Sequence, residues 1–148
     1  MFLIKPGRTL KFHTIFIVIS ISLALVPITG FTAPTEFVVQ LTKKDDNGAH
    51  RRALMQVARV LKDVGRKNVN FTVVAYEHGI TALLENNEKT AELVAGLNRL
   101  GVSFKACKVS MQASDLTEDD FPMEVDYVAA GAPELIRLRL KGYEYWRP

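Results

Sequence analysis

After residue 34, the chain alternates between short apolar runs and longer amphipathic stretches. The apolar runs are rich in Val and Phe, and polar or glycine-containing turns separate them from their neighbours, which is typical of buried strands. They predict strands at 36–41, 69–75, 102–107 and 125–130, with 143–146 as a candidate edge strand.

The amphipathic stretches between these runs predict helices. A helix of about 17 residues begins near Asp45, with Asp45, Asp46 and Asn47 as candidate N-caps, and ends at Gly65. A second helix covers 90–100, and a third follows Gly131, has Pro133 in its first turn and ends at Gly142. Residues 108–116 predict a loop or a short helix.

Strands that alternate with helices of ten or more residues need crossover connections, and crossovers produce parallel strands. The fold class expected is therefore α/β, a three-layer α/β/α sandwich whose mostly parallel sheet has about five strands, in the flavodoxin or Rossmann style. The 148 residues fit a single globular domain after an N-terminal segment.

Residues 1–33 have the layout of a signal peptide or an N-terminal anchor. A short basic stretch precedes the uncharged apolar run 14–28, and small residues follow at 29–33. We therefore expect a periplasmic or secreted protein whose folded domain covers 34–148, anchored in a membrane if the segment is not cleaved. Membrane contact is expected only through this segment.

The net charge of +3 disappears when Lys5, Arg8 and Lys11 of that segment are left out, since the rest has equal numbers of basic and acidic side chains. A neutral domain lacks the basic surface of a nucleic-acid binder, so we expect no nucleic-acid partner. Glycine-rich phosphate loops and the Gly-x-Ser-x-Gly elbow are missing, and the His and Cys residues lack metal-ligand spacing. No cofactor and no metal are expected.

Cys107 is the single cysteine and the main candidate for chemistry. It ends the third predicted strand, and ligands of open parallel sheets bind at the carboxyl ends of the strands. Strand alternation places Lys105 on the same face, and Lys108 follows directly, so two ammonium groups would favour the thiolate. We expect Cys107 to be at least partly accessible.

Two neighbouring segments complete this candidate site. His78 lies in the turn after the second strand, as a candidate base or hydrogen-bond partner. The helix after Gly131 would offer backbone N–H groups to a thiolate or persulfide, with Glu134 as a capping carboxylate.

Several segments resemble proteins of the DsrE/DsrF-like family. They are Leu97–Gly101 leading into Val102–Cys107, the strand and glycine turn Phe71–Gly79, and the C-terminal stretches Ala130–Arg137 and Lys141–Pro148. The resemblance covers 36–148 and implies the fold of this family, a homo-oligomer such as a trimer or hexamer, and a sulfur-relay role. It also implies that Cys107 carries sulfur as a persulfide, exchanged with a donor or acceptor protein.

The residues leave alternatives open. In the first interpretation, the protein is at most a sulfur carrier or a transferase-like protein that uses Cys107. In the second, it is a non-catalytic oligomeric or ligand-binding domain in which Cys107 only packs. A third interpretation is a small-anion binder that uses Lys43, Lys44 and the N-terminus of the first helix.

Overall fold

The structure, a computed structural model, describes residues 33–148, so residues 1–32 of the expected signal segment lie outside the described residues. Its five strands form one sheet in which all neighbours are parallel, in the order β4-β3-β2-β1-β5. The strands are β1 (Thr35–Leu41), β2 (Val69–Ala75), β3 (Ser103–Cys107), β4 (Val125–Val128) and β5 (Glu144–Trp146). The predicted α/β class and the edge position of the last strand are confirmed.

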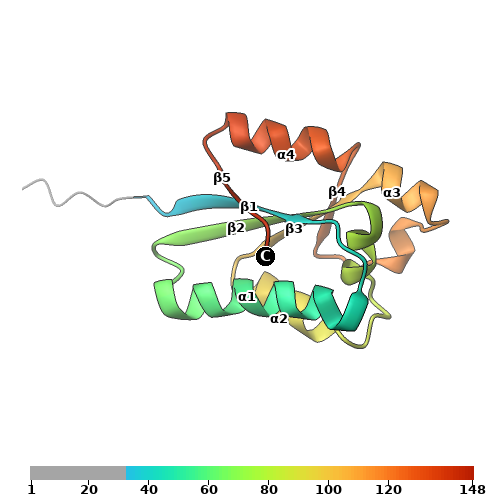
Figure 1. The fold of residues 1–148 in the computed structure, drawn as a ribbon, viewed down its shortest axis with the longest axis horizontal. Helices are drawn as coiled ribbons and strands as arrows, with labels where there is room; N and C mark the ends of the chain where they lie inside the picture. The colour runs from blue at the N-terminus through green and yellow to red at the C-terminus, as the bar shows by residue number, and fades with distance from the viewer. Residues whose placement is uncertain (1–32) are drawn as a thin grey trace, which may run out of the picture. The chain divides into compact units, whose positions relative to one another are not determined.

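Helices cover both faces of this sheet (Figure 1). The helices α1 (Ala49–Val64) and α2 (Ala91–Arg99) pack on one face, and α4 (Gly131–Leu140) packs on the other. The short helix α3 (Lys108–Ala113) follows β3 without a linker. Three 3-10 turns, η1 (Asp46–Gly48), η2 (Glu77–Leu83) and η3 (Glu118–Asp120), complete the loops.

The direction of the chain explains why α4 is alone on its face. From β1 to β4 the chain moves one strand at a time in one direction, whereas α4 carries it back across the sheet to β5 beside β1. Because crossovers are right-handed, a reversal of direction moves the connection to the opposite face. Met111 and Phe121, which connect β3 to β4, pack with the α1 and α2 side. The chain therefore leaves β3 and β4 toward opposite faces.

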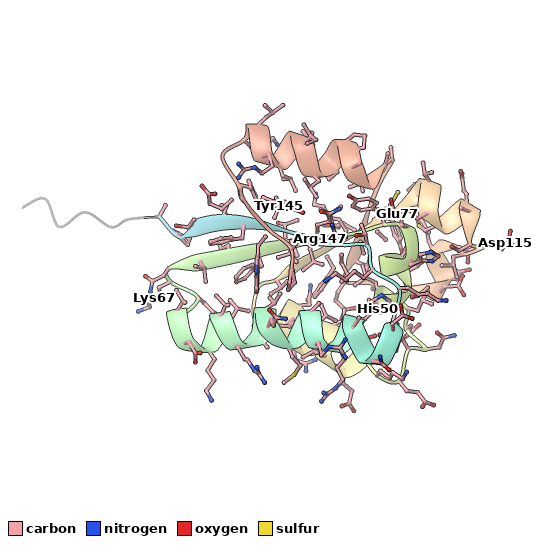
Figure 2. All side chains as sticks on the ribbon, in the orientation of Figure 1. His50, Lys67, Glu77, Asp115, Tyr145 and Arg147 are labelled. Carbon is pink, nitrogen blue, oxygen red and sulfur yellow. The ribbon has the colours of Figure 1, made fainter. Side chains whose placement is uncertain are left out.

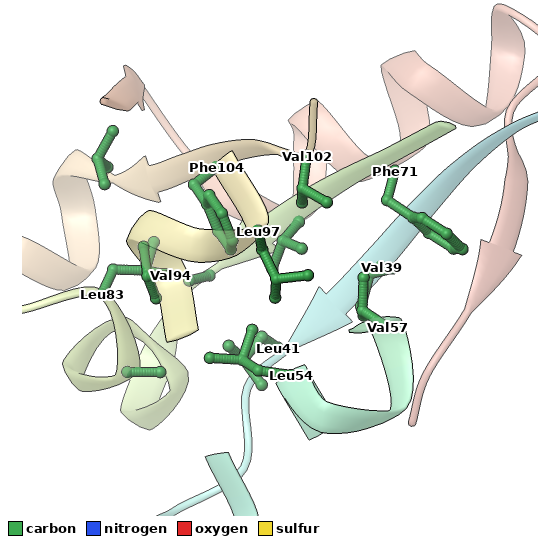
Figure 3. Close-up of a cluster of buried hydrophobic side chains, with 14 of the residues drawn as sticks. Val39, Leu41, Leu54, Val57, Phe71, Leu83, Val94, Leu97, Val102 and Phe104 are labelled. Carbon is green, nitrogen blue, oxygen red and sulfur yellow. The ribbon is translucent and has the colours of Figure 1, made fainter. Parts of the chain in front are cut away.

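The core is divided by the sheet. The larger cluster joins strand residues such as Val39, Phe71 and Phe104 to Leu54, Val57, Val94 and Leu97 of the two helices (Figure 3). On the other face, Val38 and Val74 pack against Leu135 and Leu138 of α4. Successive residues of one strand thus serve different cores, as the twofold period of a strand requires.

Several boundaries differ from those predicted: α1 begins at Ala49 and β4 ends at Val128, and two helix starts next to Cys107 matter for the site. Helix α4 begins at Gly131, two residues before Pro133, which tolerates this position because the first-turn N–H groups have no intrahelical acceptor. The segment after β3 is helical from Lys108, with Cys107 as its N-terminal flanking residue. Both helix starts therefore lie close to Cys107.

Candidate functional site

Cys107 lies where the two oppositely directed connections separate. It is the last residue of β3 and pairs with Val128 of β4. Its Sγ atom accepts a hydrogen bond of 3.2 Å from the backbone N–H of Gly131, the first residue of α4. A crevice at the carboxyl ends of two such strands is the usual ligand site of open parallel sheets. The sulfur therefore occupies the position that this topology reserves for chemistry.

Gly131 is required there because Tyr76 packs directly onto it. A Cβ atom at residue 131 would lie 2.6 Å from Cβ and from ring carbons of Tyr76, far inside van der Waals contact. The Tyr76 hydroxyl accepts a hydrogen bond from Gln40, whose amide oxygen accepts one from Tyr145. Burial and the neighbouring Glu77 carboxylate raise the pKa of Tyr76, so its phenol stays protonated at neutral pH. The ring is thereby fixed beside the backbone that binds the sulfur.

A second contact closes the site from the side of α3. Glu77 has a φ of 50°, a left-handed conformation that is uncommon for a residue other than glycine. Its backbone N–H donates to Ser110 Oγ at 2.8 Å. Ser110 is buried in the helix that begins immediately after Cys107. The end of β2 is therefore tied to the segment that follows the cysteine.

The sequence predicts that the Lys105 ammonium favours the Cys107 thiolate, but in the structure this ammonium is paired with a carboxylate. Its Nζ donates to Glu134 Oε1 at 2.9 Å, and Arg137 binds both carboxylate oxygens of Glu134 at 2.6 and 2.7 Å. The hydrogen bonds from Arg137, and then those from Lys105, hold the pKa of Glu134 below its usual range despite burial. Glu134 lies in the first turn of α4, as predicted, but its carboxylate is bound by these two side chains and is the centre of an ion-pair cluster.

The other two predicted partners are also directed elsewhere. Lys108 Nζ lies 2.9 Å from Glu118 Oε1 and 5.6 Å from the centre of the Tyr127 ring. His78 is exposed in η2, and its carbonyl accepts a hydrogen bond from Thr81. Among the described residues, the hydrogen-bond partner of the Cys107 sulfur is Gly131, and none of these side chains bonds to it.

The expected accessibility of Cys107 is wrong for this conformation, because only 3% of the residue is exposed. The reason lies in the early start of α4. Gly131, already in the helix, lies against the sulfur through its backbone N–H, and the Tyr76 ring packs on Gly131. A reagent reaches the sulfur only after these groups move.

The neighbouring β1 loop argues against the small-anion interpretation. Lys43 Nζ donates to the Pro148 carbonyl at 3.3 Å. The N-terminal turn of α1 already holds a carboxylate, since the His50 backbone N–H donates to Asp45 Oδ1 at 3.1 Å. This bond is the largest cause of a lowered pKa of Asp45. The anion position of α1 is thus filled from within the chain.

Sequence reasoning missed Tyr76, Ser110 and the pairing of Glu134. None of them carries a signal in a linear pattern, because their roles depend on which face α4 and α3 present to the sheet. Within residues 33–148, the His, Cys, Asp and Glu side chains form no group of three or more that would hold a metal ion.

The chain matches the profile of the DsrE/DsrF-like family over residues 36–146. It belongs to this family. The match lies within the predicted domain and includes every residue of the site described above. The resemblance inferred from short segments is therefore confirmed at the level of the family.

Solved structures of this type share the fold. A protein of unknown function, MTH1491 from Methanobacterium thermoautotrophicum, has 28% sequence identity and a TM-score of 0.67, covering 79% of this chain and 100% of its own. The ychN protein from E. coli has 11% identity and a TM-score of 0.57 with the same coverage, a likeness of fold alone. No curated protein matches the chain.

Proposed function

We propose that this DsrE-like protein carries sulfane sulfur as a persulfide on Cys107. The observation that carries the proposal is the 3.2 Å hydrogen bond from the Gly131 N–H to Sγ, at the crevice between β3 and β4. A backbone N–H in the first turn of a helix stabilises negative charge, and both a thiolate and a persulfide are anions. The position of Cys107 in the sheet and its hydrogen bond therefore both favour a persulfide on its sulfur atom.

The transfer is balanced without an added oxidant. The Cys107 thiol loses its proton to solvent, and the thiolate attacks the terminal sulfane sulfur of a polysulfide or persulfide donor. A new S–S bond forms on Cys107 while the donor's S–S bond breaks, and its electron pair stays on the shortened donor. The residues around Cys107 must move aside during this step, since only 3% of it is exposed.

Inorganic polysulfide and intact-protein mass spectrometry test the proposal. Native full-length protein should gain one sulfur atom after desalting and lose it with dithiothreitol, and the Cys107→Ser variant should gain none. If native protein gains no sulfur while urea-unfolded protein does, the persulfide proposal fails.

The burial of Cys107 favours a second candidate function. In that case the thiol fills a small apolar space and the domain serves as an oligomeric or ligand-binding module. The Cys107→Ala variant then keeps the function of the protein in its host, whereas a sulfur carrier loses it. The same polysulfide experiment separates the two functions.

We also propose that the protein is exported and acts in the periplasm or outside the cell, as a homo-oligomer that exchanges sulfur with a donor or acceptor protein. The basic prefix and the apolar run 14–28 support export. No helix among the described residues is long and apolar enough to cross a bilayer. N-terminal sequencing of protein from its native host tests export, with a start between 31 and 35 or a membrane-bound full-length chain as the expected result.

A further inference from the structure

We propose that the edge of the sheet opposite Cys107 docks onto an anionic phospholipid bilayer when residues 14–28 lie in that bilayer. The docking surface, named the basic rim, consists of the last turn of α1, the turn before β2 and the end of α2. Its residues are Lys62, Val64, Arg66, Lys67, Arg99 and Leu100. This proposal is independent of the sulfur chemistry of Cys107.

The basic rim lies at the point where the N-terminal segment joins the domain. The backbone N–H of Thr35, the first residue of β1, donates to the Asn68 carbonyl at 2.8 Å. Asn68 directly follows Arg66 and Lys67. Residues 29–34 connect the apolar run to Thr35, and six residues of any conformation reach at most about 20 Å. An embedded run 14–28 would therefore hold the rim within about that distance of the lipid headgroups.

The composition of the rim fits a bilayer surface. All four cations are exposed, and none forms a salt bridge with another described residue. Asp63 is the one carboxylate in the segment 62–68. Val64 and Leu100 are 45% and 44% exposed, so apolar side chains stand among the cations. Basic residues near an anionic membrane each contribute about 1 kcal/mol, and the apolar side chains enter the headgroup region.

The shape and the charge of the opposite edge agree with this orientation. Arg66, Lys67 and Leu100 line a hollow of about 660 Å³ at the rim. At the other edge, Glu85, Asp119 and Asp120 line a hollow of about 320 Å³. Figure 2 shows Lys67 at one end of the described domain, and Glu77 and Asp115 toward the other. An anionic surface attracts the first edge and repels these carboxylates of the second, which turns the edge that holds Cys107 away from the bilayer.

Lysine footprinting of the full chain tests the proposal. The protein is reconstituted into pure phosphatidylcholine vesicles or into vesicles that also contain phosphatidylglycerol, and treated with a membrane-impermeant acetylating reagent. Lys44, exposed at the carboxyl edge, is the internal reference. With phosphatidylglycerol, acetylation of Lys62 and Lys67 relative to Lys44 should fall roughly fivefold or more, and high salt should restore it.

A pair of variants separates the rim from general charge attraction. Arg66→Gln with Arg99→Gln should abolish most of the protection and leaves both lysine probes intact. Arg51→Gln with Arg59→Gln removes the same charge from exposed positions of α1 outside the rim, and protection should persist.

Five results would overturn the proposal. Equal protection in both kinds of vesicle would mean that the tether alone shields the rim. Equal protection of Lys44, or equal loss in the two double variants, would mean that docking is unspecific. Protection already present in detergent micelles would assign the rim to a second copy of the chain. Acetylation of Lys62 and Lys67 as complete as that of Lys44 in both kinds of vesicle would mean that the rim does not dock.

Discussion

At the scale of single residues, Glu134 contributes to the pH dependence of the stability of the domain. Its pKa is lowered by Arg137 and Lys105, so the unfolded state binds its proton more readily than the folded state. The ion pairs therefore stabilise the fold above the ordinary carboxyl pKa of 4.5, and this contribution is lost as the pH falls through the lower folded pKa. We expect Glu134→Gln to reduce the free energy of unfolding by about 1–2 kcal/mol at pH 7.

Urea unfolding at several pH values measures this effect. The difference between wild type and Glu134→Gln should shrink on acidification below the ordinary carboxyl pKa, whereas Glu92→Gln, an exposed site on α2, should change little at any pH. A constant difference across the whole range would show that the charge of Glu134 does not matter.

Gly131 gives a steric prediction at the same scale. A methyl group there meets Tyr76 Cβ at 2.6 Å, so either the ring or the start of α4 must move. We expect Gly131→Ala to destabilise the protein by about 1–3 kcal/mol and to expose the Cys107 thiol, which native-state alkylation would detect. Gly96→Ala in α2 meets only the end of Arg99, at 3.9 Å, and should be neutral or stabilising. Similar losses for both variants would contradict the close Tyr76 contact.

At the scale of elements, α3 holds the turn after β2 in place. Ser110→Ala removes the acceptor of the Glu77 N–H, and Glu77 already has an unfavourable φ of 50°. We expect a loss of about 1–2 kcal/mol in thermal or urea unfolding and faster hydrogen exchange in η2. The exposed Ser114→Ala at the end of α3 is the matched control and should lie close to wild type. Unchanged hydrogen exchange in η2 would show that the hydrogen bond from Glu77 to Ser110 does not stabilise that turn.

The elements also show where sequence reasoning succeeds. The β-branched run 69–75 and the periodic apolar face before Gly65 matched the observed β2 and α1 because burial on both sides of a sheet or on one side of a helix leaves a local pattern. The parallel arrangement then placed Cys107 at the carboxyl edge. Its burial was not predictable, because it depends on the start of α4 at Gly131 and on the packing of Tyr76, which no periodicity records.

The prediction that lysine charges stabilise the Cys107 thiolate was wrong for a related reason. Strand alternation correctly put Lys105 on the face of Cys107, but the rotation of α4 decided that its ammonium would meet Glu134. Contacts between elements far apart in sequence, here 29 residues, are set by packing and not by spacing along one element.

At the scale of the whole molecule, the face covered by α4 is the natural place for the expected oligomer contact. The ring centres of Trp146 and Phe71 are 5.8 Å apart, and Tyr143 packs against the cluster formed by Val38, Val74 and α4. These aromatic side chains therefore cover their own sheet. Ile136 and Leu140, four residues apart on α4, remain 57% and 84% exposed. A helix residue pair with this spacing shares one face, and burying that face in a second copy would remove apolar surface from water.

Light scattering of the full chain, corrected for bound detergent, should give a mass of three or six chains at tens of micromolar, the trimer or hexamer implied by the family resemblance. Leu140→Glu with Ile136→Glu should lower that mass toward the monomer, because two charges would have to be buried without partners. Val109→Glu, an equally exposed apolar site on α3, should leave the mass unchanged. A monomeric wild type would refute the oligomer. An intact oligomer in the double variant would show that the interface does not include Ile136 and Leu140 of α4.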